Sequence, residues 1–357
     1  MDRVYLDYNA TNPLRAQARQ AMVAALDIVG NPSSVHAEGR AAKSLIENAR
    51  RDVAALVGCA PAEVVFTSGA TEAARVLAPL SKHYSIRVDP TAHDALLAYA
   101  GKPDTGTISE RQVLSMGLAN SETGIINPLP NQQAGTWHSP PSKADLLMLD
   151  ITQAAARIAF DFQTSGADLA ILSAHKLGGP KGIGALIVRQ GLDIESLSLG
   201  GGQEMGRRSG TENLVGIAGF GAAAVAAKQD FEAGRWDEIK ELRKILENAL
   251  AAEAKTTIFV GIDADRLPNT TCMVTPGWKG EAQVIQMDLA GFAISAGSAC
   301  SSGKVRASSV LRAMGFEDAT ASCAIRVSLG LETTKDQVLR FAQTWLDKEQ
   351  KFRARAA

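Results

Sequence analysis

The chain has 357 residues and a formal net charge of −1, with 46% hydrophobic and 21% charged residues. This length exceeds what one hydrophobic core usually serves, so two domains are expected, and the composition is that of an ordinary globular protein. The near-neutral charge gives no electrostatic reason to expect nucleic acid or an anionic membrane as a partner. No apolar run is long enough to span a bilayer, and the first residues lack the pattern of a signal peptide. We therefore expect a cytoplasmic protein.

Short apolar runs alternate with helical patterns through the first two thirds of the chain. The spacing of apolar residues predicts a helix over 39–57 that ends at Gly58. Compact apolar runs predict strands at 64–67, 146–149, 169–172 and 183–188. This alternation predicts a mostly parallel sheet with helices on both faces.

Three further segments carry weaker patterns. Residues 127–143 are rich in Pro, Gln, Gly and Ser, which predicts an irregular connection. An apolar face over 236–251 predicts a helix that bridges the large domain to a smaller C-terminal one. The basic end, 348–357, is expected to be frayed.

Four cysteines stand at positions 59, 272, 300 and 323. They form no Cys-x-x-Cys pair, which argues against a zinc site or a disulfide framework. Cys59, Cys272 and Cys323 lie in apolar sequence and are expected to be buried and inert. Cys300 lies in a small, polar stretch, which indicates an exposed and mobile thiol.

Polar residues follow three of the predicted strands, at Thr67, Asp150 and Ser173. Ligands of parallel sheets collect at the carboxyl ends of strands. Lys176 comes just after the third of these strands in a Gly-rich turn, where a lysine can form a Schiff base with an aldehyde cofactor. A plain surface lysine is the alternative interpretation.

Two other features bear on the same chemistry. The carboxylate of Asp150 could pair with a pyridinium nitrogen, although it could also be a helix N-cap. The small residues of 68–72 at a strand-to-helix junction would expose N–H groups to a phosphate, although such junctions often do nothing beyond capping a helix. A phosphate turn, then Asp150, then Lys176, each at a strand end, together indicate such a cofactor site more specifically than any one of them does alone.

At this point the chain resembles the class V, fold-type I pyridoxal phosphate (PLP) enzymes, and among them the NifS/IscS-like cysteine desulfurases. The matching motifs are Tyr5–Thr11, Gly30–Ser34 with His36, Ser68–Glu72, Asp150–Gln153, Ser173–Lys176, Arg208–Thr211, Gly297–Cys300 and Ile325–Gly330. The resemblance implies an α/β fold with a large domain, 12–235, built on a mainly parallel seven-stranded-type sheet. A smaller α+β domain would comprise 1–11 and 236–357 and carry the catalytic cysteine loop.

The resemblance also implies a role for each matching residue. Lys176 would hold pyridoxal 5'-phosphate and move the Cα proton, and Cys300 would receive sulfur from L-cysteine as a persulfide. His93 would stack on the cofactor ring and donate a proton. Other contacts to the cofactor would come from Ala70, Thr71, Asp150, Gln153, Ser173, His175, Ser121 and, from the second subunit of a homodimer, Thr211. Arg326 would bind the substrate carboxylate, together with Asn9 and Asn31.

The predicted function is therefore a cysteine desulfurase that supplies sulfur to an acceptor protein for iron–sulfur cluster or thio-cofactor assembly. A selenocysteine lyase-type activity and a non-catalytic paralogue that serves as a structural or regulatory partner are the alternatives. Three departures from the family pattern motivate the second alternative: Ser121 stands where an asparagine is usual, Arg75 stands where an asparagine is common, and the region 77–144 is short.

Overall fold

The computed structural model describes residues 3–101, 111–133, 135–139, 142–297 and 307–356. Contacts divide the chain into two units. The larger unit comprises 13–118 and 127–231, and the smaller comprises 1–12, 119–126 and 232–357. The short segment 119–126 thus belongs with the smaller unit, although it lies within the boundaries that the sequence suggests for the large domain.

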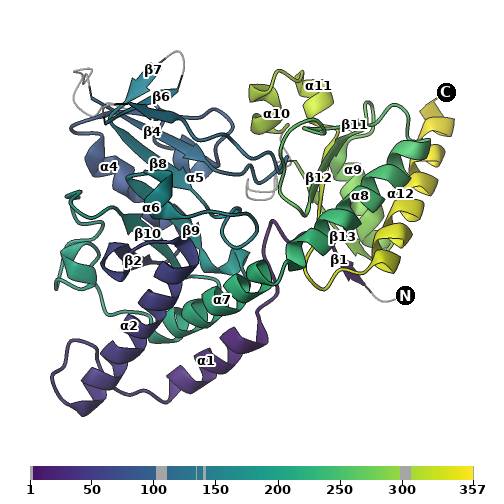
Figure 1. Ribbon diagram of the computed structural model, residues 1–357. Helices are drawn as coiled ribbons and strands as arrows, with labels where there is room; N and C mark the ends of the chain where they lie inside the picture. Colours follow the sequence, from purple (N-terminus) through teal and green to yellow (C-terminus); the bar gives the residue numbers. More distant parts are fainter. Residues whose placement is uncertain (1–2, 102–110, 134, 140–141, 298–306, 357) are drawn as a thin grey trace. The chain divides into compact units, whose positions relative to one another are not determined.

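The larger unit is built on a sheet in the order β2-β10-β9-β8-β4-β3 (Figure 1). Its strands are β2 (Val64–Thr67), β3 (Ser85–Val88), β4 (Gln112–Gly117), β8 (Leu146–Asp150), β9 (Leu169–Ser173) and β10 (Gly184–Val188). Only β10 runs antiparallel to its neighbours among these strands. The sheet has six strands among the described residues, one fewer than the predicted seven-stranded type. Between β3 and β4 the described residues form one short helix, α5 (Asp94–Leu97), and no further strand.

Helices cover both faces of this sheet, as the alternation of elements predicts. On one face α2 (Ala37–Val57) packs against α7 (Leu214–Glu232) so closely that a Cβ on Gly221 would come 2.7 Å from the Ala49 side chain. Helix α1 (Ala16–Leu26) also contacts α7. The other face is covered by α3 (Ala70–Ala73), α4 (Leu77–Leu80) and α5. The central strands are buried throughout, which is why they read as continuous apolar runs.

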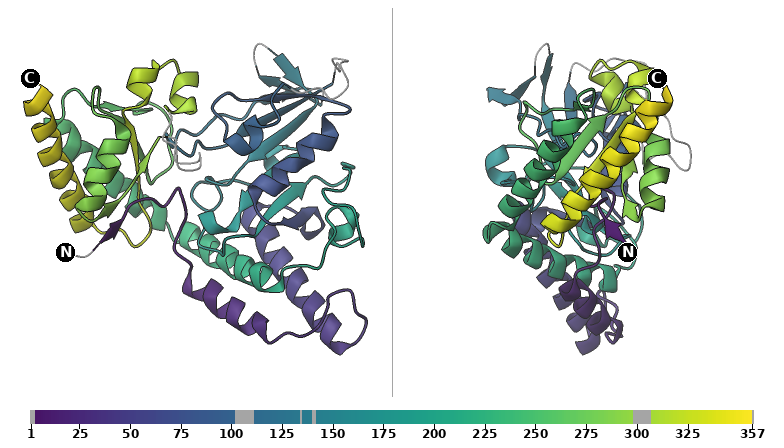
Figure 2. Two further views of the ribbon diagram at one scale, coloured as in Figure 1. Left: turned by 180° about the vertical axis from the view of Figure 1, so that it is seen from behind. Right: turned by 90° about the vertical axis from the view of Figure 1, so that its right-hand side faces the viewer.

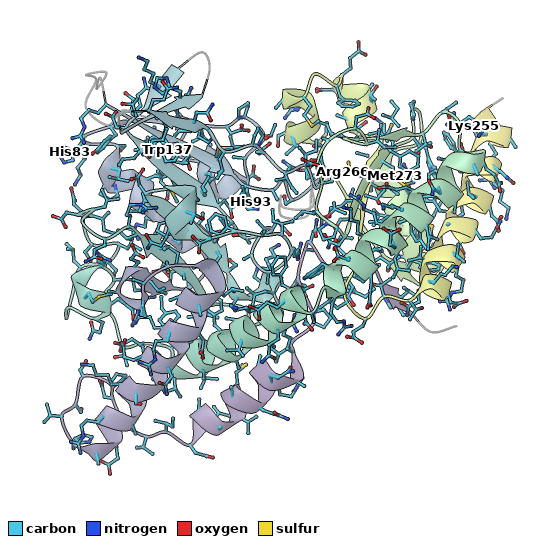
Figure 3. The ribbon with its side chains drawn as sticks, viewed as in Figure 1. His83, His93, Trp137, Lys255, Arg266 and Met273 are labelled. Carbon is cyan, nitrogen blue, oxygen red and sulfur yellow. The ribbon has the colours of Figure 1, made fainter. Side chains whose placement is uncertain are left out.

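Residues 127–143, predicted to be irregular, instead contribute to a small antiparallel sheet, so that prediction was wrong. Its strands are β5 (Asn131–Gln133), β6 (Thr136–Ser139) and β7 (Ser142–Ala144). Trp137, labelled in Figure 3, is the apolar anchor of this sheet, and its indole N–H donates to Asp168 at 3.3 Å. The polar composition hid the strands: residues 131–133 and Lys143 are exposed, and only Trp137 and Ala144 are buried among the strand residues whose burial is described. Short helix α6 (Phe162–Ser165) follows β8.

The smaller unit has an antiparallel sheet in the order β11-β12-β15-β14. Its strands are β11 (Ile258–Phe259), β12 (Thr270–Val274), β14 (Ser295–Ala296) and β15 (Ala324–Ser328), and β1 (Val4–Tyr5) pairs separately with β13 (Phe292–Ala293). The helices of this unit are α8 (Arg235–Glu253), α9 (Gly280–Leu289), α10 (Ser309–Ala313), α11 (Asp318–Ala321) and α12 (Lys335–Ala356). Figure 2 shows α8 and α12 side by side.

The C-terminal residues are helical rather than frayed, so that expectation was wrong. Helix α12 continues to Ala356. The ring of Phe352 stacks on Trp278 with centroids 5.4 Å apart, and Arg353 forms an ion pair with Glu349. These contacts hold the end of α12 against the smaller unit, although its basic composition by itself predicts an unpacked helix end. No helix in the described part of the chain is long and apolar enough to cross a membrane.

Candidate functional site

The carboxyl ends of the parallel strands bring several predicted site residues to one edge of the larger unit's sheet. Gly184, at the start of β10, pairs with both Thr67 and Ser173. Asp150 is the last residue of β8 and pairs with Ile171, two residues before the end of β9. We refer to Thr67–Glu72, Asp150–Arg157 and Ser173–Lys176 together as the strand-end cluster.

The phosphate turn, 68–72, is held against the end of β9. The N–H of Ala70 donates to the Ser173 hydroxyl at 2.8 Å. Gly184 approaches so closely that a Cβ there would come 2.6 Å from the Gly69 Cα, so this position requires glycine. Thr71 is exposed in the first turn of α3, where backbone N–H groups have no intrahelical acceptor.

An ion pair supports the same turn. The carboxylate of Glu72 accepts a hydrogen bond from the Ser68 N–H and pairs with Arg208 Nε at 2.9 Å. Burial raises the pKa of Glu72, but the hydrogen bonds from Arg208 and Ser68 outweigh it and bring the pKa below its ordinary value. Glu72 therefore stays ionised at neutral pH. This pair was not anticipated from the sequence, although Glu72 and Arg208 both lie in matching motifs.

Lys176 and His175 lie in a 3₁₀ turn, Ala174–Lys176, that begins directly after β9. Both side chains are partly buried. Burial, and then the charges of Lys176 and Lys181, lower the pKa of His175 to about 4. The imidazole is therefore neutral at pH 7 and can offer one N–H to an anionic group.

Asp150 begins a turn rather than a helix, so its interpretation as a helix N-cap was wrong. Its carboxylate accepts from the Thr152 N–H at 2.9 Å, and residues 152–157 form turns instead of an α-helix. Gln153 is buried, and its side-chain oxygen accepts from Arg157 Nη1 at 2.6 Å. Arg157 also donates to the carbonyl of Lys176 at 3.0 Å. It thereby ties the Asp150–Gln153 turn to the lysine.

Sequence reasoning did not identify Arg157, although a buried arginine is a strong signal once the structure is known. It is 3% exposed, and it donates to residues 4 and 19 positions away. The chain reaches this geometry through Ala156, which takes a left-handed conformation with φ 58°. Left-handed backbone is uncommon for residues other than glycine and often marks a constrained site.

Other predicted residues of the larger unit come from separate segments of the chain. His93, labelled in Figure 3, is the N-cap of α5, and its Nδ1 accepts from the Ala95 N–H at 3.1 Å, which places its ring proton on Nε2. Thr211 is exposed. The side chain of Asn31 accepts from the Ser33 N–H within its own turn, before α2.

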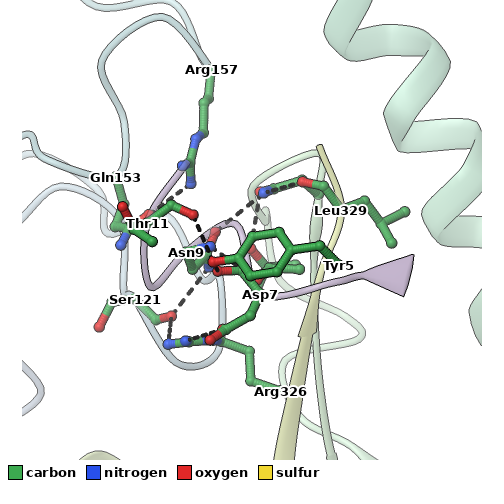
Figure 4. A network of polar contacts seen from close by, with 12 residues as sticks. Tyr5, Asp7, Asn9, Thr11, Ser121, Gln153, Arg157, Arg326 and Leu329 are labelled. Atoms are coloured by element: carbon green, nitrogen blue, oxygen red, sulfur yellow. Dashed lines mark hydrogen bonds and ion pairs between the residues drawn. The ribbon is translucent and has the colours of Figure 1, made fainter. Parts of the chain in front are cut away.

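The smaller unit holds Arg326 in a buried polar network (Figure 4). Arg326 is 3% exposed, and it donates to the carboxylate of Asp7 at 2.8 Å and to the carbonyl of Ser121 at 3.0 Å. Its Nε is also buried and has no hydrogen-bond partner among the described residues. Asp7 was not predicted as a site residue, although it lies in the Tyr5–Thr11 motif. We call Asp7, Asn9, Ser121, Thr270 and Arg326 the Arg326 network.

Asn9 is the centre of this network. Its side-chain amide donates to the Ser121 carbonyl at 3.2 Å and to the Thr270 hydroxyl at 2.8 Å. Its oxygen accepts from Asn269 at 3.2 Å. Asn9 is 1% exposed, so its amide organises the network from within. Ser121 takes part through its carbonyl, which any residue would supply at that position.

The three described cysteines are unsuited to act as nucleophiles. Cys272 and Cys323 are buried and Cys59 is half-buried. Burial, followed by nearby carboxylates, raises the pKa of Cys59 and of Cys272 to about 12, so both are protonated thiols. Cys300 lies outside the described residues. Within the part of the chain that the structure describes, no cluster of three or more His, Cys, Asp or Glu could hold a metal ion.

The residue types of the strand-end cluster fit pyridoxal phosphate. A carboxylate, a lysine and a turn of small residues lie at one edge of the sheet, and these suit the ring nitrogen, the aldehyde and the phosphate of the cofactor. Thr152 Oγ1 is buried there without a partner among the described residues. The glycine at 184 lets strand β10 pack directly against the Gly69 backbone and so supports the phosphate turn from below.

Comparison with known proteins defines the family. The class-V aminotransferase family matches residues 4–95 and 79–341. A cysteine desulfurase of Cereibacter sphaeroides is 36% identical over 375 residues, covering 96% of this chain and 95% of its own length. A cysteine desulfurase of a Frankia species is 37% identical, covering 94% and 88%. A solved NifS-like protein superposes with a TM-score of 0.86 at 27% identity, covering 98% of this chain and 99% of its own.

A second solved structure, a NifS-like protein from Rickettsia africae ESF-5, superposes with a TM-score of 0.84 at 26% identity, covering 98% of this chain and 99% of its own. Sequence matches and structural matches thus agree over nearly the whole chain. The chain belongs to the class-V aminotransferase family of pyridoxal-phosphate-dependent enzymes and, within it, to the NifS/IscS-like cysteine desulfurases.

Proposed function

We propose that this chain converts L-cysteine to L-alanine and passes the substrate sulfur to Cys300 as a persulfide. The observation that carries the proposal is the arrangement of Lys176, Asp150 and the phosphate turn at one edge of the sheet. The relatives named cysteine desulfurase support the choice of substrate. The intact cluster favours an enzyme over a non-catalytic paralogue, despite Ser121, Arg75 and the short region 77–144.

The residues of the strand-end cluster have separate tasks in this proposal. Lys176 holds the cofactor and moves a proton at the substrate Cα. Asp150 pairs with the cofactor's ring nitrogen and keeps it protonated. Gln153, held by Arg157, donates to the ring hydroxyl, and Ser121 contacts the same hydroxyl. When bound, pyridoxal phosphate supplies an electron sink for the carbanion at Cα.

The phosphate and the ring have their own contacts. Ala70, Thr71, Ser173 and His175 bind the phosphate in this proposal, and the imidazole of His175 donates an N–H to it. Thr211 reaches the phosphate of a second copy of the chain, so the working form is a homodimer. Its exposure within one copy is compatible with that role. His93 stacks on the ring and donates a proton from Nε2.

Arg326 binds the substrate carboxylate, with Asn9 and Asn31 as further contacts. The thiolate of Cys300 then attacks the substrate sulfur. An S–S bond forms as the substrate C–S bond breaks, and the bonding electron pair stays on the substrate carbon. That carbon takes up a proton and becomes the methyl group of alanine, so no outside oxidant is needed. The persulfide passes to an acceptor protein in the cytoplasm for iron–sulfur cluster or thio-cofactor assembly.

The test is alanine formation from L-cysteine together with mass spectrometry of Cys300. The wild type should form alanine and gain one sulfur atom on Cys300. Cys300→Ala should lose persulfide formation, and Lys176→Ala should lose both readouts. Full desulfurase activity in Cys300→Ala would overturn the proposal. Parallel assays with L-selenocysteine decide the substrate: a preference for selenocysteine that does not need Cys300 would favour the lyase activity.

A further inference from the structure

The two described ends of the chain around Cys300 meet at one carboxylate in the smaller unit. Residues 298–306 are not among those described, but Gly297 and Ser308 are. A Cβ on Gly297 would lie 3.1 Å from the Ser308 Cβ and 3.4 Å from Oε2 of Glu122. The Ser308 hydroxyl donates to that same oxygen. We call residues 298–306 the Cys300 segment. Glu122 therefore hydrogen-bonds Ser308, which comes just after this segment, and its carboxylate lies near Gly297, which comes just before it.

The direction of the hydrogen bond between Ser308 and Glu122 follows from a second contact. Ser308 is fully buried, and its Oγ accepts from the Leu311 N–H at 3.0 Å as the N-cap of α10. A hydroxyl has a single proton, so that proton is directed to the Glu122 carboxylate. The start of α10 is thus fixed to Glu122.

Glu122 is itself fixed by a closed turn, 120–124. The side-chain oxygen of Asn120 accepts from the N–H groups of Glu122 and Thr123, both at 2.9 Å. The carbonyl of Gly124 accepts from Leu267 at 2.7 Å, which ties the turn to the rest of the smaller unit. A Cβ on Gly124 would come 2.7 Å from Thr270 and φ there is 75°, so the turn has little freedom.

The same turn contacts Arg326. The carbonyl of Ser121 accepts from Arg326 Nη1, and the next residue, Glu122, accepts from Ser308. Two neighbouring residues of one rigid turn therefore contact the proposed carboxylate-binding arginine and the base of the Cys300 segment. Because both contacts lie within the smaller unit, their geometry does not depend on the placement of the larger unit.

We infer that Glu122 is a positioning residue for sulfur transfer, which fixes the base of the Cys300 segment relative to the arginine that binds the substrate. The inference rests on the proposed function. Glu122 touches neither substrate nor cofactor in this role and acts through Ser308. The Glu122 side chain holds Ser308, near the nucleophile, whereas the backbone carbonyl of Ser121 in the same turn holds Arg326. Removal of the side chain should therefore separate sulfur transfer from substrate binding.

The experiment compares Glu122→Ala with the wild-type holoenzyme in two measurements. The first is the single-turnover rate of persulfide formation on Cys300, and the second is the L-alanine concentration that half-saturates the spectral change of the bound cofactor. Glu122→Ala should slow persulfide formation by roughly tenfold to a hundredfold, the size expected for one lost hydrogen bond to a charged group. Half-saturation by L-alanine should change by less than about threefold, because backbone contacts hold Arg326.

Two further variants separate positioning from a general loss of structure. Ser308→Ala should slow persulfide formation as well. The double variant, Glu122→Ala with Ser308→Ala, should be no slower than the slower single variant, because each substitution removes the same Ser308–Glu122 hydrogen bond. Glu281→Gln, at the exposed first turn of α9, is the matched control and should behave as wild type. Equal losses in both measurements, additive losses in the double variant or an unchanged persulfide rate would each overturn the inference. If Cys300→Ala alone forms alanine normally, the proposed function fails instead.

Discussion

The strand-end cluster of the larger unit and the Arg326 network of the smaller unit are held in place by different means. In the strand-end cluster, sheet register aligns Thr67, Gly184 and Ser173, and side-chain contacts refine the result. In the Arg326 network, chain segments far apart in sequence meet through buried side chains and one carbonyl. Arg326 contacts residues 205 and 319 positions away. The first arrangement depends on strand pairing, and the second depends on individual hydrogen bonds.

This difference predicts how each region responds to substitution. A position fixed by register tolerates loss of a side chain but not a change in backbone spacing. A position fixed by hydrogen bonds fails when one charged partner is lost, because the other partner stays buried without compensation. The four predictions that follow use substitutions that act on one region and leave the other unchanged.

The largest effect is expected from Arg326→Ala. The variant removes a buried guanidinium and leaves Asp7 without its partner, so kcat/KM for L-cysteine should fall about a thousandfold, roughly 4 kcal/mol. Arg326→Lys should recover only part of this, because lysine cannot form the planar fork. Affinity for pyridoxal phosphate, measured by fluorescence titration, should stay within about threefold.

A parallel loss of cofactor affinity in Arg326→Ala would mean that the two regions are not independent. Asp7→Asn combined with Arg326→Met provides the folding control, because it removes both charges and leaves neither buried alone. That double variant should unfold at nearly the wild-type temperature but bind L-cysteine as poorly as Arg326→Ala.

A smaller effect is expected from Gly184→Ala in the strand-end cluster. The new Cβ would meet the Leu172 carbonyl at 2.5 Å and the Gly69 Cα at 2.6 Å, and both are backbone atoms. Strand β10 must shift away from the phosphate turn, at a cost of about 1–3 kcal/mol in the free energy of unfolding. The variant should also lose more affinity for pyridoxal phosphate than for pyridoxal, which lacks the phosphate.

The control for Gly184→Ala is Gly201→Ala, whose nearest neighbours are atoms at the end of the flexible Gln203 side chain. It should cost less than Gly184→Ala in chemical denaturation. If both ligands lose affinity equally in Gly184→Ala, the close approach does not serve the phosphate in particular.

The pH dependence of stability provides a second test of the strand-end cluster. The pKa of His175 is lowered to about 4, whereas an unfolded histidine titrates near 6.5. The unfolded state therefore binds more protons between these values, and stability falls as the pH drops from about 6.5 towards 4. The loss should grow steadily through this window and level off below pH 4.

The contribution of His175 is measured as the difference in unfolding free energy between wild type and His175→Gln across this pH range. The cofactor-free protein is used, because a bound phosphate would favour the charged imidazole. His175→Gln should show a shallower decline below pH 6.5. Identical pH profiles would show that His175 is not held neutral in this cluster.

The place of the candidate site residues at one edge of the larger unit's sheet could be predicted from the sequence, for a physical reason. Apolar runs mark the strands, and the polar residues that end them, such as Asp150 and Ser173, must meet at one edge of a parallel sheet. The motifs of the resemblance added Lys176 and the phosphate turn. Arg157 and the Glu72–Arg208 pair escaped prediction, because nothing in the local pattern of a charged residue shows that tertiary packing will bury it.

The smaller unit was less predictable. Arg326 was found by resemblance, but its contacts to Asp7 and to a carbonyl depend on long-range folding that no periodicity records. The larger unit also held one error, because the small sheet at 131–144 was missed: its polar strands carry few apolar residues to form a period. The last helix was expected to fray because charge patterning did not reveal the Phe352–Trp278 stack.

The smallest effect is expected where the chain departs from the family pattern, at Ser121. The position contacts Arg326 and Asn9 through its carbonyl, so the side chain is not needed for the Arg326 network. Ser121→Asn should therefore change half-saturation by L-alanine by less than about twofold, the range of an ordinary surface substitution. If the asparagine side chain instead improves contact with the ring hydroxyl, pyridoxal phosphate affinity should rise while half-saturation by L-alanine stays constant.

Ser121→Pro provides the contrast, because the proline ring constrains the turn at 120–124 and should weaken binding of L-alanine. A large change in L-alanine binding in Ser121→Asn would show that the side chain, and not the carbonyl, governs the arginine.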